Sequence, residues 1–160
     1  MYKFIIGSLL VFLSCFAEAQ SPRMIKWPEL EAMLNTKSDT TYVINFWATW
    51  CKPCVQELPH FDKLEKTFAG QKIKVILISL DFKRQFETNL KPYLVKNKVV
   101  SDVYLIDEPD YDLWIDKVDK SWSGAIPATL ILNNTLGTRN FYERDFTLEE
   151  INKTVKPLLP

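Results

Sequence analysis

The feature that most constrains this chain is a pair of cysteines, Cys51 and Cys54, placed where a strand pattern gives way to a helical one. Residues 41–47 have the sequence T-Y-V-I-N-F-W, a run that favours a strand covered on both faces. From residue 51 to residue 68 the apolar positions recur every three or four residues, which predicts an amphipathic helix. The unpaired N–H groups of a helix N-terminus lower a cysteine pKa and favour the thiolate. The sequence therefore indicates dithiol–disulfide exchange before it indicates a substrate.

Helical and strand patterns alternate along the rest of the chain, after a short extended lead-in. Helices are predicted over residues 27–34, 51–68, 81–98, 110–118 and 147–156, and strands over residues 41–47, 72–80, 103–106, 128–132 and 138–143. Pro59 is expected to kink the second helix and Pro92 to divide the third, and Thr147 and Glu150 are spaced as a capping box. This order predicts an α/β fold with a central mixed β-sheet flanked by helices and its chemistry at the carboxyl ends of the parallel strands.

The size and charge of the chain limit its function class. Its 160 residues suffice for one domain with a single sizeable core. Lysine plus arginine and aspartate plus glutamate number 20 each, and no basic or acidic run stands out. Nucleic acid is therefore not an expected partner, because neutralising phosphates requires clustered lysines and arginines.

The N-terminal residues have the pattern of a secretory signal peptide. Lys3 precedes an apolar stretch over residues 4–16, and A-E-A at residues 17–19 fits a cleavage site. The apolar stretch is shorter than the roughly twenty residues that span a bilayer. We therefore expect residues 1–19 to be a cleaved signal peptide and residues 20–160 to be the mature domain, exported to the periplasm.

The cysteine count agrees with export. Cleavage would remove Cys15 and leave only the pair Cys51 and Cys54, so that no stray thiol enters an oxidising compartment. A lipoprotein is the alternative: L-S-C at residues 13–15 would then be a lipobox, and Cys15 would be acylated and anchored to the membrane.

Two segments carry motifs that go beyond a lone C-x-x-C: N-F-W-A-T-W-C-K-P-C at residues 45–54 followed by E-L-P, and G-A-I-P-A-T at residues 124–129. Over roughly residues 25–158 the chain resembles the thioredoxin superfamily, and within it the TlpA/ResA-like extracytoplasmic thiol–disulfide oxidoreductases. The resemblance implies a thioredoxin-like fold in which a cis-proline loop lies beside the C-x-x-C motif. Asn45 departs from thioredoxins proper, which place a buried aspartate at this point, and matches the TlpA/ResA-like branch.

Cys51 is the expected nucleophile, in the exposed first turn of the helix, where Lys52 adds positive charge. Cys54, buried one turn further, is expected to resolve the mixed disulfide. A static disulfide or half of a zinc site is the alternative, but zinc needs about four ligands and the mature chain adds only His60. Pro53 limits backbone freedom between the two cysteines. The Lys-Pro pair resembles the thioredoxin-like couples, which lie at the reducing end of the range of redox potentials, more than the oxidising Pro-His type.

Other site residues follow from the resemblance. Pro127 is expected to be the cis-proline, so that the backbone of Ile126 pairs with an extended substrate strand; a trans proline opening a strand is the alternative. Glu57 is expected to handle the proton of Cys54, and its alternative is a solvated helix glutamate. Trp50 is expected to shape the surface that partner proteins meet.

The expected function is an extracytoplasmic oxidoreductase that exchanges its dithiol and disulfide with envelope proteins, as a reductase of the type that serves cytochrome c maturation. The resemblance implies a membrane-bound electron donor and no metal or organic cofactor. Two alternatives stay open: a disulfide-forming oxidant, and a copper-binding thioredoxin-fold chaperone. Paired thiolates suit copper(I), but such chaperones usually add a later histidine ligand, and none follows His60. A peroxidase is not expected, because the cysteines are paired as C-x-x-C.

Overall fold

A six-stranded mixed sheet organises residues 21–160, the part of the chain that the computed structural model describes. The expected signal peptide and Cys15 lie outside the described residues. The strand order is β1-β4-β3-β2-β5-β6. The strands are β1 (Arg23–Ile25), β2 (Thr41–Trp47), β3 (Ile73–Ser79), β4 (Asp102–Ile106), β5 (Ala128–Asn133) and β6 (Thr138–Tyr142).

Helices connect and cover these strands. The α-helices are α1 (Trp27–Leu34), α2 (Lys52–Thr67), α3 (Lys91–Asn97), α4 (Ile115–Val118) and α5 (Leu148–Val155). Shorter 3-10 turns span Lys83–Gln85, Tyr111–Leu113 and Lys156–Leu158, and a π-helical turn spans Phe86–Leu90. None of the helices within residues 21–160 is long and apolar enough to cross a membrane.

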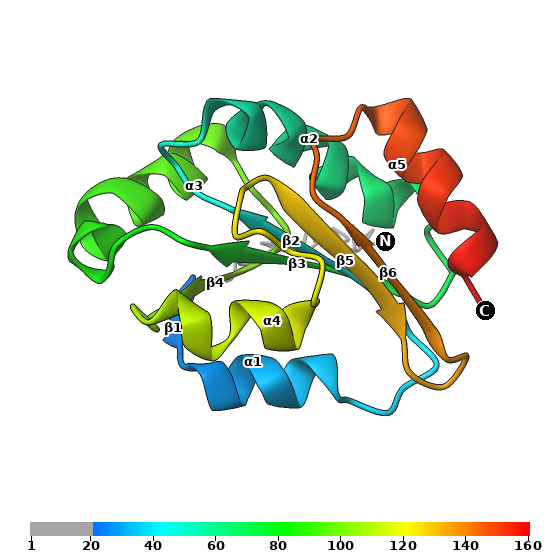
Figure 1. Ribbon diagram of the computed structural model, residues 1–160. Helices are drawn as coiled ribbons and strands as arrows, with labels where there is room; N and C mark the ends of the chain where they lie inside the picture. The colour runs from blue at the N-terminus through cyan, green and yellow to red at the C-terminus, as the bar shows by residue number, and fades with distance from the viewer. Residues whose placement is uncertain (1–20) are drawn as a thin grey trace, which may run out of the picture.

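The sheet is the middle of three layers (Figure 1). Helices α2, α3 and α5 cover one face, where Phe61, Leu64 and Ile151 are buried against the central strands. Helices α1 and α4 cover the other face, where Trp27 and Trp114 stack in an aromatic cluster. Burial on both faces explains why the sequences of β2, β3 and β5 are almost continuously apolar.

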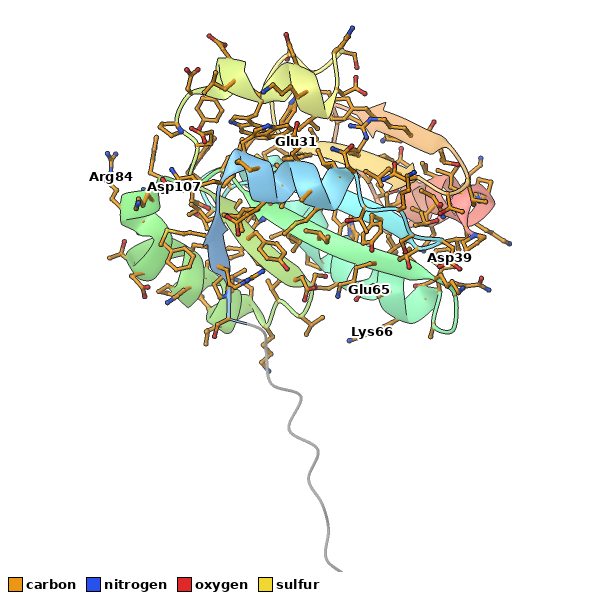
Figure 2. The ribbon with its side chains drawn as sticks, turned by 90° about the horizontal axis from the view of Figure 1, so that it is seen from below. Glu31, Asp39, Glu65, Lys66, Arg84 and Asp107 are labelled. Atoms are coloured by element: carbon orange, nitrogen blue, oxygen red, sulfur yellow. A yellow bond between two sulfur atoms is a disulfide. The ribbon has the colours of Figure 1, made fainter. Side chains whose placement is uncertain are left out.

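The central strand β2 decides the topology. It pairs in parallel with β3 and antiparallel with β5, which begins the final hairpin, so the predicted mixed sheet is confirmed. The carboxyl ends of β2, β3 and β4 therefore meet at one edge. Figure 2 shows Arg84 and Asp107, which follow β3 and β4, at this end of the molecule, and Asp39, which precedes β2, at the opposite end.

Three local predictions differ from the structure. The lead-in contains a strand, β1, whose three residues pair in parallel with β4; so short a strand has no periodicity to detect. The segment over residues 81–98 begins with 3-10 and π turns, and its α-helix starts only at Lys91, with Pro92 in the first turn. The segment over residues 110–118 divides in the same way into a 3-10 turn and the short α4. The predicted capping box of Thr147 and Glu150 is confirmed at the start of α5.

Candidate active site

The two cysteines lie at the junction that the sequence predicts, and they form a disulfide. Strand β2 ends at Trp47, a turn closes with the N–H of Cys51 donating to the carbonyl of Ala48 at 3.1 Å, and α2 begins at Lys52. Cys51 is thus the N-cap of α2, and its Sγ accepts the N–H of Cys54 at 3.3 Å. A thiolate at this sulfur after reduction would be stabilised by that N–H and by the helix dipole.

The two sulfurs differ in how solvent reaches them. Cys54 is fully buried and Cys51 is 7% exposed, so Cys51 is the more accessible of the two cysteines. The expectation that Cys51 sits in an exposed first turn is wrong in detail, because it is the capping residue and is itself nearly buried. The neighbouring Trp50 is 58% exposed, and Trp47 is fully buried beneath the motif. The ring of Trp50 is therefore accessible at the surface beside the motif.

The segment before β5 closes the other side of the disulfide. The Ile126–Pro127 peptide bond is cis, and the carbonyl oxygen of Ile126 lies 3.8 Å from Sγ of Cys51. The indole N–H of Trp122 donates to the carbonyl of Ala125 at 2.8 Å, which holds this loop in place. The cis-proline loop therefore places the backbone of Ile126 beside Cys51, directly before β5 begins at Ala128.

A carboxylate also fixes this loop. Glu143, at the end of β6, accepts hydrogen bonds from the backbone N–H groups of Ser123 at 3.0 Å and Ala125 at 3.2 Å. Sequence reasoning missed Glu143, and no local pattern points to it, because the contact is made only when the final hairpin forms.

Glu57 is buried, 2% exposed, one turn beyond Cys54 on α2. Its Oε1 accepts from Nδ2 of Asn45 at 2.8 Å, and its Oε2 accepts from the backbone N–H of Phe146 at 2.8 Å. The alternative, a solvated helix glutamate, is therefore wrong. Burial raises the pKa of Glu57 to about 7, although these two hydrogen bonds act in the opposite direction. Both protonation states are accessible near neutral pH, as a proton carrier requires.

Asn45 links this carboxyl group to the start of β5. Its Nδ2 also lies 3.1 Å from Oγ1 of Thr129, the residue that pairs with it across the sheet. Its Oδ1 is buried and has no hydrogen-bond partner within residues 21–160. Sequence reasoning identified Asn45 only as a departure from thioredoxins, and it missed Thr129 and Phe146, whose contacts with α2 and β2 are long-range.

Pro53 lies in the first turn of α2, where a proline needs no N–H partner. His60 is turned toward the carbonyl oxygen of Phe146, with Nδ1 at 2.9 Å. No group of three or more histidine, cysteine, aspartate or glutamate side chains arranged to hold a metal ion occurs in the described part of the chain.

Fold and site together define a thioredoxin-fold protein that carries a C-x-x-C disulfide at the head of a helix. The chain belongs to the AhpC/TSA family, whose model matches residues 29–136. Among curated proteins it is similar to the thiol-disulfide oxidoreductase ResA of Geobacillus kaustophilus, with 22% identity over 121 residues. That match covers 73% of this chain and 62% of ResA, so the chain spans less than two thirds of the length of this relative.

Solved structures agree on the fold. A thioredoxin-related protein from Neisseria meningitidis serogroup B superposes with a TM-score of 0.64 at 21% identity, covering 77% of this chain and 87% of the other. StoA from Bacillus subtilis superposes with a TM-score of 0.57 at 20% identity, covering 72% and 82%. The predicted thioredoxin-like fold is confirmed.

Proposed function

We propose that this protein is an extracytoplasmic thiol–disulfide oxidoreductase that exchanges the Cys51–Cys54 pair with protein partners. One observation carries the proposal, the different placement of the two cysteines. Sγ of Cys51 caps α2, accepts the N–H of Cys54 and lies beside the cis-proline segment, whereas Cys54 is fully buried. This arrangement separates an attacking sulfur from a resolving one. The similarity to proteins named thiol-disulfide oxidoreductase supports the same activity.

The exchange proceeds in two displacements. The Cys51 thiolate attacks one sulfur of a partner disulfide, a new bond joins the two sulfurs, and the other partner sulfur leaves as a thiolate. Glu57 then takes the proton of Cys54, whose thiolate attacks Sγ of Cys51. The Cys51–Cys54 disulfide forms, the second partner sulfur is released, and two electrons have passed to the partner. The raised pKa of Glu57 suits it to accept this proton and return it.

Partners would bind where Cys51 is approachable. An extended segment that carries the reacting cysteine would pair with the backbone of Ile126 beside Pro127, a form of β-augmentation. The exposed ring of Trp50 offers apolar surface on the other side of the sulfur. We expect the partners to be protein disulfides of the cell envelope, because a protein segment can pair with the backbone of Ile126 while its cysteine meets Cys51.

We propose that the protein acts as a reductase, of the type that serves cytochrome c maturation, with a membrane-bound donor supplying electrons. The Lys52–Pro53 pair between the cysteines supports this direction. We expect a reduction potential below about −180 mV, measured by equilibrating the protein with thiol buffers of known potential and alkylating the free thiols. Replacing both residues, Lys52→Pro with Pro53→His, should raise the reduction potential. A wild-type potential well above this value would identify a disulfide-forming oxidant.

The extracytoplasmic location rests on the predicted signal peptide. We expect the protein recovered from the envelope of an exporting bacterium to begin at Gln20, with the mass of residues 20–160. Intact-protein mass spectrometry of the full-length product measures this directly. A mass that begins at an acylated Cys15 would show that the protein is a lipoprotein, and an unprocessed cytoplasmic product would overturn the location.

A further inference from the structure

A buried carboxylate outside the C-x-x-C motif is bound to the turn that presents the reactive cysteine. Asp81 follows β3 and is 3% exposed. Its Oδ2 accepts from the backbone N–H of Thr49 at 3.0 Å, and its Oδ1 accepts from the hydroxyl of Thr49 at 2.5 Å. Ser79 donates its hydroxyl to Oδ2 at 2.7 Å and fixes the carboxylate from the β3 side.

Thr49 lies inside the turn between β2 and α2. The turn is closed by one backbone hydrogen bond, from the N–H of Cys51 to Ala48, and Cys51 is only two residues beyond Thr49. Two residues span at most about 7 Å, so a shift of Thr49 moves the sulfur relative to the N–H of Cys54 that it accepts. Asp81 is thus the side chain that ties this turn to the neighbouring strand.

We propose that Asp81 is a positioning residue for thiol–disulfide exchange: its carboxylate holds the Thr49 turn so that Cys51 stays at the head of α2 when the disulfide is open. The inference rests on the proposed function and adds a residue to it. In the oxidised protein the disulfide itself restrains Cys51. In the reduced protein that restraint is absent, and the bonds from Asp81 to Thr49 take its place.

This difference between redox forms separates positioning from general stability. A contact that stabilises the oxidised and reduced folds equally changes the unfolding free energy of both and leaves the reduction potential unmoved. A contact that matters more in the reduced form shifts the potential to a more negative value when it is lost. A tenfold change in the exchange equilibrium corresponds to about 30 mV for this two-electron couple.

The test compares Asp81→Ala, which removes all three bonds, with Asp81→Asn. An asparagine can keep them, with its carbonyl oxygen accepting from Thr49 and Ser79 and its NH2 group donating to the Thr49 hydroxyl. We expect Asp81→Ala to shift the exchange equilibrium with glutathione about tenfold, about 30 mV, toward the oxidised protein and to slow alkylation of Cys51 at pH 7. We expect Asp81→Asn to restore the alkylation rate and to avoid the negative shift.

Asp62 offers a matched control. Its carboxylate binds a turn in the same manner, accepting from the backbone N–H of Ser101 at 3.0 Å and from the Ser101 hydroxyl at 2.8 Å. That turn precedes β4 and so lies at the opposite end of the strands from the disulfide. Asp62→Ala should lower the stability of both redox forms and leave the potential unchanged.

The outcomes are distinguishable. If Asp81→Ala lowers the unfolding free energy equally in both forms without moving the potential, as Asp62→Ala is expected to do, Asp81 is only structural and the inference is wrong. If Asp81→Ala and Asp81→Asn shift the potential alike, the charge and not the positioning is responsible, and the inference is equally wrong. If the wild-type protein does not exchange with glutathione at all, it is the proposed function that fails.

Discussion

In the Cys54→Ser variant, partner proteins should accumulate as mixed disulfides on Cys51. The variant keeps the attacking sulfur at the head of α2 and removes the buried sulfur that would release the partner. Each attack on a partner disulfide then stops after the first displacement. To measure this, the tagged variant is recovered from envelope extracts after acid quenching and alkylation and is separated by non-reducing electrophoresis. Bands that disappear when the sample is reduced are then identified by mass spectrometry.

The controls use the same pair of positions. Cys51→Ser should capture nothing and lose turnover entirely, because Cys54 is fully buried and cannot be reached by a partner. The double serine variant measures capture that does not depend on the site. Capture by Cys51→Ser but not by Cys54→Ser would mean that the two roles are reversed. Captured proteins with C-x-x-C-H haem-binding motifs would support the cytochrome c maturation role, and their absence among abundant captures would count against it.

The residues that the sequence could identify lie close together along the chain. Cys51, Cys54 and Glu57 share one helix, so their spacing alone places them on neighbouring positions of its first two turns. Pro127 could be identified because its neighbours resemble a known segment. The apolar runs of seven residues likewise predicted β2 and β3, and the three- and four-residue spacing over 16 residues predicted α2.

The residues that support the site could not be identified in this way. Thr49 and Asp81 are 32 positions apart, and Glu57 and the backbone N–H of Phe146 are 89 apart. A backbone N–H leaves no trace in the sequence, because every residue except proline supplies one. Asp81 has no motif of its own, and only the parallel pairing of β2 with β3 brings it to the turn before Cys51. Tertiary structure, more than local pattern, supplies the second layer of this site.

Glu57 should make the oxidised protein less stable as pH rises through neutrality. Its pKa is about 7 in the folded protein against an ordinary value of 4.5, so between these values the folded state holds a proton that the unfolded state has lost. The free energy of unfolding therefore falls as pH rises across this window, by about 1.4 kcal/mol per unit at most and about 3 kcal/mol in total. The oxidised form is the one to measure, because its cysteines do not titrate.

Glu57→Gln should remove this pH dependence. The glutamine carbonyl can accept the N–H of Phe146, and its NH2 group can donate to Asn45 if the Asn45 amide turns its buried, unpartnered Oδ1 toward it. We expect the variant to match the wild type near pH 4.5 and to be more stable by about 3 kcal/mol near pH 8, measured by urea denaturation. Glu149→Gln, an exposed change on α5, should keep the wild-type slope. An equally steep slope in Glu57→Gln would show that another group causes it.

The same variant should be slow in the second displacement of the exchange. The variant lacks the carboxylate that we propose as the acceptor of the Cys54 proton, and the neighbouring Asn45 cannot replace it because an amide does not take a proton at neutral pH. Loss of a general base costs about 10²-fold or more, so resolution of a preformed mixed disulfide should slow by about that factor. Alkylation of Cys51 should stay near the wild-type rate, since that sulfur is stabilised by the head of α2. A variant that is more stable at pH 8 yet resolves at the wild-type rate would show that Glu57 is buried for structural reasons and that the proton leaves by another route.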